Sequence, residues 1–203
     1  MKVEIVAKSS DPTGAVSRAA GLCYGKDDKN FNRIVNCYKA GHTSVLEHAS
    51  VTFKVEGVSR ACSHQLVRHR LASYCQESQR YNKYSLDGDD WYVVPQSFES
   101  NAYELAKFND SMLQQAEYYR SALRAGMKPE DARYLLPEAT KTSLAVTMNL
   151  RSLFHFFDLR LGKKAQWEIR ELAWQMFYRL QEDEEFAYFA ELYLTFRENT
   201  RID

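Results

Sequence analysis

The chain has 203 residues, 45% of them hydrophobic and 27% charged, so it is long enough to bury a core and has an ordinary globular composition. Its 27 basic and 27 acidic residues cancel to a net charge of zero, which argues against a protein that coats nucleic acid, because such proteins carry a basic excess. The four cysteines form no CxxC pair and no apolar run approaches the length of a membrane span, so we expect reduced thiols, no membrane partner and a cytoplasmic location.

The first half of the chain alternates predicted strands with short helices. Alternating polar and apolar residues predict strands, and apolar residues three or four positions apart predict helices. We expect strands at 3–6, 51–56 and 91–95, and helices at 15–23, 30–40 and 59–70. Ser59 is the expected N-cap of the helix over 59–70.

The second half is predicted to be mainly helical. A stripe of apolar residues predicts a long helix over 100–125, which Gly126 and Pro129 end. We expect further helices at 129–136, 152–161, 166–180 and 185–197, and a strand at 140–149. The predicted fold class is therefore α+β. It is a single mixed domain over residues 1–203, in which long helices flank a central antiparallel-type sheet and the C-terminal half is rich in helix.

The segment 68–81 concentrates the residues that bind anions. From Ser59 to Tyr81 there are four arginines and one acid, Glu77, a local excess of three positive charges. Arginine presents a planar fork of donors that matches phosphate and carboxylate, so the segment predicts an anion site. The alternative is a helix end whose arginines cover apolar neighbours at the surface.

Two other kinds of chemistry are not indicated. Ser78 has no general base beside it in the sequence, and a serine nucleophile needs a partner to take its proton, so we expect its hydroxyl to position a ligand. The five histidines show no zinc-like spacing and no cysteine pair near them. We therefore expect no metal ion.

The arginine segment also resembles a known signature. Arg68-His69-Arg70, then seven residues, then Ser78-Gln79-Arg80 is similar to the motif of the flavin-dependent thymidylate synthases. Further blocks resemble the same family in the same order, and they lie at 41–48, 131–137, 149–152, 158–160 and 165–169. The resemblance therefore covers most of the chain.

The resemblance implies an enzyme that methylates dUMP to dTMP. It implies FAD as cofactor, methylenetetrahydrofolate as one-carbon donor, NADPH as the reductant of the flavin, and a homotetramer with active sites between subunits. Two alternatives remain open from the residues. One is a non-catalytic nucleotide- or RNA-binding module that uses the arginines only to hold phosphates. The other is an assembly protein whose aromatic helices and arginine loop make subunit contacts.

The resemblance also implies which residues form the sites. Arg160 and Arg68 are the expected catalytic residues. The expected dUMP-binding residues are Gln65, Arg68, Gln76, Glu77, Ser78, Gln79, Arg80, Arg133 and Arg160. The expected FAD-binding residues are Ser44, Glu47, Arg68, His69, Arg70, Leu71, Asn149, Arg151 and His155. The chain departs from the common pattern of the family at Cys75, Gln76 and His155, where asparagine, glutamate and asparagine are frequent.

Overall fold

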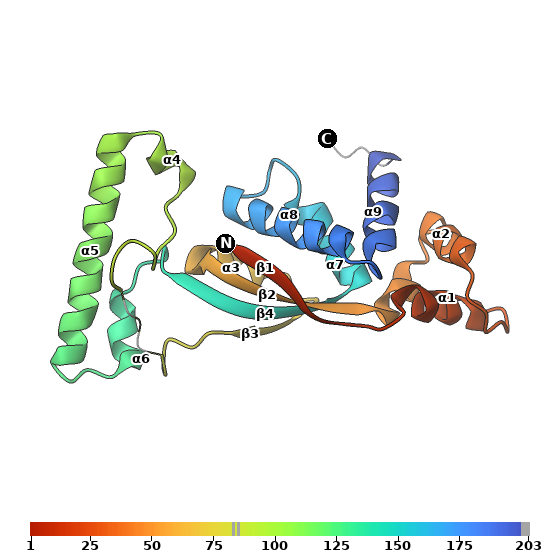
Figure 1. Cartoon of the computed structure of the whole chain (residues 1–203), viewed down its shortest axis with the longest axis horizontal. Helices are drawn as coiled ribbons and strands as arrows, with labels where there is room; N and C mark the ends of the chain where they lie inside the picture. Colours follow the sequence, from red (N-terminus) through yellow and green to blue (C-terminus); the bar gives the residue numbers. More distant parts are fainter. Residues whose placement is uncertain (83, 85, 200–203) are drawn as a thin grey trace. The chain divides into compact units, whose positions relative to one another are not determined.

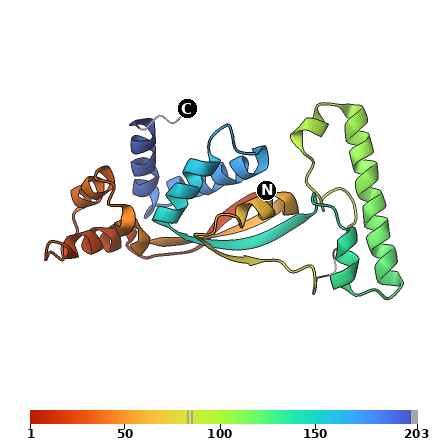
Figure 2. The ribbon, with the colours of Figure 1, turned by 180° about the vertical axis from the view of Figure 1, so that it is seen from behind.

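The strands form one four-stranded sheet in the order β1-β2-β4-β3 (Figure 1). The computed structural model describes residues 1–82, 84 and 86–199. The strands are β1 (Lys2–Lys8), β2 (Ser50–Ser59), β3 (Ser73–Gln76) and β4 (Lys141–Asn149). Thr52 bonds to Thr147, whereas Arg60, just after β2, bonds to Thr140, just before β4. Because β4 runs back as β2 advances, the two central strands are antiparallel, and β3 forms an edge (Figure 2).

Helices occupy most of the remaining chain. The longer ones are α1 (Pro12–Leu22), α2 (Phe31–Lys39), α5 (Ala102–Arg124), α7 (Leu150–Arg160), α8 (Trp167–Glu182) and α9 (Ala187–Asn199). The shorter ones are α3 (Arg60–Leu66), α4 (Gln96–Glu99), α6 (Pro129–Ala132) and the 3-10 helices η1 (Thr43–His48) and η2 (Arg133–Leu135). Within the described residues, no helix is both long and apolar enough to cross a bilayer.

The chain divides into two compact units. The first unit comprises Met1, Glu56–Leu66 and Cys75–Leu144, and the second comprises Lys2–Val55, Val67–Tyr74 and Ala145–Asp203. The core of the first unit forms where α5 buries Met112, Ala116 and Tyr119 against a cluster that includes Trp91 and Tyr92. The core of the second unit is aromatic, with rings of α7, α8 and α9 in edge and tilted contacts (Phe157, Phe177 and Tyr193).

The first turn of α1 depends on a residue in an unusual backbone conformation. Asp11 has φ 45° and ψ 57°, in the left-handed region that residues with a side chain rarely adopt. Its carboxylate accepts the N–H of Gly14 at 3.0 Å and pairs with Lys29 at 2.6 Å. The cap and the ion pair together hold Asp11 in this conformation and fix the start of α1.

The predicted fold class is confirmed, and so are most of the predicted elements. Ser59 caps α3 as expected, because its hydroxyl accepts the N–H of Cys62 at 2.9 Å. The predicted strand at 91–95 is wrong, since only an isolated bridge joins Tyr92 to Thr140. Trp91 and Tyr92 are both buried, so this segment lacks the alternating exposure of a half-buried strand. The single domain over 1–203 stays a prediction.

Candidate active site

A cavity of about 600 Å³ in the second unit collects five of the nine residues expected to bind FAD. These are Glu47, Leu71, Asn149, Arg151 and His155. Glu47 belongs to η1 and Leu71 lies in the turn after α3. Asn149 ends β4, and Arg151 and His155 lie in the first turns of α7. We call this the flavin cavity. Its remaining wall includes Tyr38, Leu46 and Phe154, which supply aromatic and aliphatic surface.

The start of α7 supplies the polar groups of the flavin cavity. The Asn149 side-chain oxygen caps the helix by accepting the N–H of Ser152 at 2.9 Å, which leaves its amide N–H groups available. Arg151 forms an ion pair with Glu47 across the cavity lining. Both side chains are about half exposed, so the pair is a weak constraint that a ligand is able to replace.

His69 is the buried centre of the Arg-His-Arg segment. Its Nε2 lies 3.0 Å from the carbonyl oxygen of Ser152, and a carbonyl only accepts, so Nε2 carries the proton. Burial, followed by the nearby His155, lowers the pKa of His69. The ring is therefore neutral at pH 7. It packs 5.5 Å from the His155 ring and 5.4 Å from the Phe156 ring.

The arginines that flank His69 do not share its buried position. Arg68 and Arg70 are exposed, and neither has a hydrogen-bond or ion-pair partner within the described residues. α3 ends at Leu66, whereas the sequence predicts a helix to Arg70. The physical reason is the inward turn at His69, whose carbonyl accepts the hydroxyl of Tyr74 at 2.7 Å while its ring bonds to α7.

Arg160 lies at the C-terminal end of α7, where a cation is favoured by the helix dipole. Its Nε is buried and has no hydrogen-bond partner among the residues that the structure describes. A buried donor without a partner is costly, so a rearrangement that gives this nitrogen an acceptor is favoured. Tyr74 lies close enough to Arg160 for its pKa to be affected, although burial dominates and raises the pKa of Tyr74 to about 12.

The first unit brings together two arginines that are far apart in sequence. Arg80 donates from Nε to a carboxylate oxygen of Glu130 at 3.0 Å, and its Nη2 lies 3.0 Å from the same oxygen in an ion pair. Arg133 donates from Nε to the backbone carbonyl of Glu130 at 3.1 Å. The carboxylate of Glu130 raises the pKa of Arg80. These two arginines, both expected to bind dUMP, therefore converge on one residue, which already offers Arg80 an anionic partner.

Sequence reasoning missed Glu130 as part of this cluster. It precedes Arg133 by three positions in a short helical segment, and residues at this spacing are neighbours on a helix. That spacing is the signal that points to the contact with Arg133. Nothing in the sequence indicates the contact with Arg80, which lies fifty positions away.

The segment between β3 and Arg80 is held by hydrogen bonds to the chain itself. The side-chain nitrogen of Gln76 donates to the hydroxyl groups of Ser63 at 2.9 Å and Thr142 at 3.3 Å. The hydroxyl of Ser78 accepts the N–H of Arg80 at 3.2 Å, which fits a positioning role. Gln65 and Gln79 are half-buried, and neither has a hydrogen-bond partner within the described ranges.

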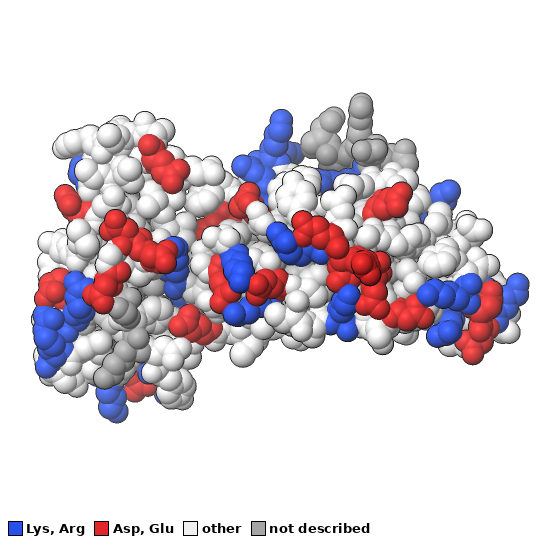
Figure 3. Space-filling model, in the orientation of Figure 1, with Lys and Arg blue, Asp and Glu red and all other residues white. Residues whose placement is uncertain are grey.

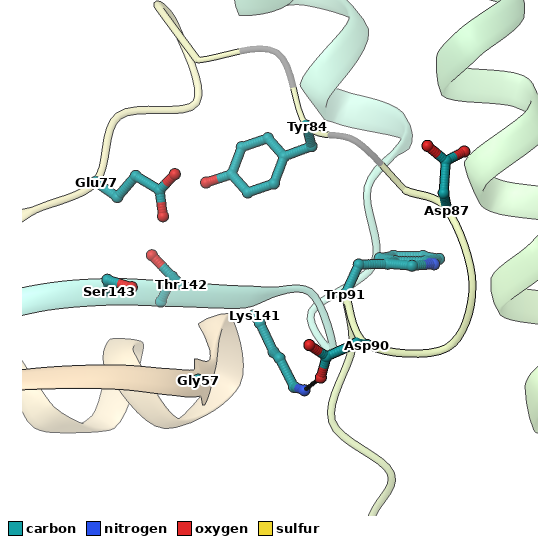
Figure 4. A pocket seen from close by; sticks show the side chains of 9 residues that line it. All are labelled: Gly57, Glu77, Tyr84, Asp87, Asp90, Trp91, Lys141, Thr142 and Ser143. Atoms are coloured by element: carbon teal, nitrogen blue, oxygen red, sulfur yellow. Dashed lines mark hydrogen bonds and ion pairs between the residues drawn. The ribbon is translucent and has the colours of Figure 1, made fainter. Parts of the chain in front are cut away.

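Glu77 lies in a second cavity, of about 350 Å³, which belongs to the first unit (Figure 4). Figure 4 shows its carboxylate and the hydroxyl of Tyr84 pointing toward each other, with Lys141 bonded to Asp90 at the other end. Burial is the main cause that raises the pKa of Tyr84, and the negative charge of Glu77 is the second.

The residues expected to bind dUMP are divided between the two units. Arg68 and Arg160 belong to the second unit, and the other members belong to the first.

Neither a metal centre nor a basic surface stands out in the described structure. Its residues include no group of three or more histidine, cysteine or acidic side chains able to hold a metal ion. All four cysteines are free. On the face shown in Figure 3, lysine and arginine side chains are interspersed with acids. An extended nucleic-acid surface requires a continuous basic patch, and this face offers none.

Comparison with known protein families gives an extended match. A family model described as "Thymidylate synthase complementing protein" matches residues 4–183. A flavin-dependent thymidylate synthase of Pyrococcus abyssi is 47% identical over 146 residues, which cover 71% of this chain and 60% of the relative. One from Geobacter sulfurreducens is 46% identical over 187 residues, which cover 87% of this chain and 80% of the relative.

Two solved structures have the same fold. One is a flavin-dependent thymidylate synthase of Helicobacter pylori complexed with FAD and dUMP, with a TM-score of 0.72 and 29% identity, covering 89% of this chain and 94% of that one. The other is a UMP/dUMP methylase from Streptomyces cacaoi bound with 5-Br dUMP, with a TM-score of 0.83 and 25% identity, covering 96% and 94%.

Proposed function

Because the chain belongs to the flavin-dependent thymidylate synthase family, we propose that it binds FAD and methylates dUMP to dTMP. Five expected flavin-binding residues around one cavity carry this proposal. The one-carbon donor is methylenetetrahydrofolate, and NADPH reduces the flavin. The active enzyme is a cytoplasmic homotetramer with sites between subunits.

The residues of the flavin cavity fit a flavin cofactor in chemistry. Leu46, Tyr38 and Phe154 supply apolar and aromatic surface for a flat ring, and Arg151 and Asn149 supply donors for its polar groups and phosphates. Neutral His69 fixes the Arg-His-Arg turn against α7, and Leu71, which follows this turn, lines the cavity. When bound, FAD supplies the hydride that reduces the transferred one-carbon group.

The nucleotide is bound through its phosphate and its uracil ring. Arg80 and Arg133 grip the phosphate, with help from Gln65, Gln76, Glu77, Ser78 and Gln79. Arg160, with Arg68 close by, stabilises negative charge on the uracil ring, which makes carbon-5 nucleophilic. A guanidinium performs this role without titrating near neutral pH. The buried, unpartnered Nε of Arg160 supports this assignment.

The proposal is tested by activity and by flavin uptake. The purified chain is loaded with FAD and given dUMP, methylenetetrahydrofolate and NADPH, and dTMP is measured by chromatography. We expect dTMP only when all components are present, and flavin absorbance that bleaches when NADPH is added without oxygen. Failure to take up FAD, or bleaching without any dTMP, would contradict the proposal.

A pair of variants tests the phosphate site. Arg133→Gln removes one guanidinium expected to bind phosphate, so the KM for dUMP should rise by about tenfold. Arg124→Gln is the matched control, because Arg124 is a surface arginine of the same unit that pairs with Glu117. Equal effects of the two substitutions would show that Arg133 acts only through the general charge of the unit.

A further inference from the structure

A third cavity, of about 380 Å³, lies in the second unit along α2. Lys26, in the loop before α2, and Arg33 line it, together with the side-chain amides of Asn32 and Asn36 and with His42. We call it the α2 cavity. No residue expected to bind FAD or dUMP lines it, so the proposed sites do not account for it.

The polar groups of the α2 cavity suit an anion. Arg33 is fixed and neutralised by Asp28, whose carboxylate lies 2.7 Å from its Nη2. Lys26, by contrast, forms no ion pair with any residue that the structure describes, and the amides of Asn32 and Asn36 are likewise without partners there. Asp28 also feels the charge of Lys26, so Lys26 and Arg33 bring two positive charges against one carboxylate, and the cavity keeps an excess of one positive charge with amide donors around it. That is the donor set that a carboxylate requires.

The α2 cavity and the flavin cavity share one stretch of chain. Tyr38 and Thr43 line the flavin cavity, whereas their close neighbours in sequence, Asn36, Cys37 and His42, line the α2 cavity. The two cavities belong to the same compact unit. On α2 the two sets of residues face different sides of the helix. The linings meet just after α2, where His42 of the α2 cavity is followed by Thr43 of the flavin cavity, so a ligand with one end at the flavin reaches the α2 cavity past this segment.

The proposed reaction supplies a ligand with this chemistry. Methylenetetrahydrofolate has a pteridine end, which carries the reacting carbon, and a glutamyl tail, which carries carboxylates far from that carbon. Polyglutamyl forms carry one additional carboxylate for each residue added. We propose, on the basis of the proposed function, that the α2 cavity binds the glutamyl tail of the folate and that Lys26 pairs with one of its carboxylates. The site then favours polyglutamyl over monoglutamyl folates.

The test measures binding directly, so that it does not depend on turnover. Tetrahydropteroyl mono- and triglutamate are titrated into the FAD-loaded full chain by calorimetry, with wild type, Lys26→Met and Lys29→Met. Lys29 is the matched control because it lies in the same loop but pairs with Asp11 at 2.6 Å and does not line the cavity. Thermal melting establishes that each variant is folded.

We expect wild type to bind the triglutamate more tightly than the monoglutamate. Lys26→Met should weaken triglutamate binding by about fivefold, and Lys29→Met should leave it unchanged. Asn36→Asp places a negative charge in the cavity and should also weaken it. Equal affinity of wild type for the two folates, with Lys26→Met indistinguishable from Lys29→Met, would overturn the inference. If wild type forms no dTMP, the proposed function is refuted instead, whatever the binding results.

Discussion

Glu130 is the residue whose replacement gives the clearest test of the nucleotide site. Its carboxylate accepts a hydrogen bond from Arg80 Nε at 3.0 Å and forms an ion pair with Arg80 Nη2, and its backbone carbonyl accepts a hydrogen bond from Arg133. A phosphate that binds Arg80 through the same two nitrogens must displace this carboxylate. Glu130→Gln removes the negative charge and keeps the size of the side chain and the backbone contact.

The expected effect follows from the exposure of the pair. The Arg80 side chain is 53% exposed and that of Glu130 is 35% exposed, and exposed ion pairs are weak. Releasing Arg80 from such a pair should therefore tighten dUMP binding by about twofold to fivefold. Repulsion between Glu130 and the phosphate acts in the same direction. The gain should shrink as salt is added, because both effects are screened.

In the assay, the FAD-loaded chain is titrated with dUMP at low and at high ionic strength, and calorimetry measures the heat of binding. Glu138→Gln is the control, because Glu138 is an exposed acid of the same unit whose partner is His64. Tighter binding in Glu130→Gln alone is the expected result. Weaker binding would show that Glu130 positions Arg80 for the nucleotide, and the competition argument would then be wrong.

Three further predictions concern residues of the second unit and the arginine segment. Arg160→Ala should lower dTMP formation by about 100-fold or more while flavin absorbance of the purified protein persists, and equal loss of both would contradict its role. Ser78→Ala should keep turnover within about tenfold of wild type, and complete loss with dUMP binding intact would restore the nucleophile hypothesis. Burial lowers the pKa of His69, so the folded state binds fewer protons than the unfolded state, and stability is lost as pH falls below about 6.5. Urea unfolding at pH 7 and pH 5 should show a smaller loss in His69→Gln than in wild type.

The elements with strong periodicity could be predicted from the sequence. The alternation along β4 reappears as alternate buried side chains, and the apolar stripe of α5 buries Met112, Ala116 and Tyr119. The cap at Ser59 was also predictable, because N-capping is a local interaction. Patterns fixed by neighbouring residues are visible in a single sequence.

Elements fixed by distant contacts could not be predicted. β3 is only four residues long, and it forms because β4 provides hydrogen-bond partners along its edge. The end of α3 at Leu66 depends on the contact of His69 with Ser152, eighty-three positions away. The same holds for the site. The motif indicates which arginines bind anions, but the pairing of Arg80 with Glu130 follows from tertiary structure alone.

The cap of α1 restricts which mutations each of its two partners tolerates. A Cβ atom added at Gly14 would lie 2.0 Å from the Asp11 carboxylate, so Gly14→Ala expels the capping group. The same substitution should be nearly harmless once Asp11 is replaced by glycine, which also relieves the positive φ. Positions 11 and 14, which are in contact through the cap, are therefore expected to show strong epistasis. Among homologues, a larger residue at one position should accompany a smaller residue at the other.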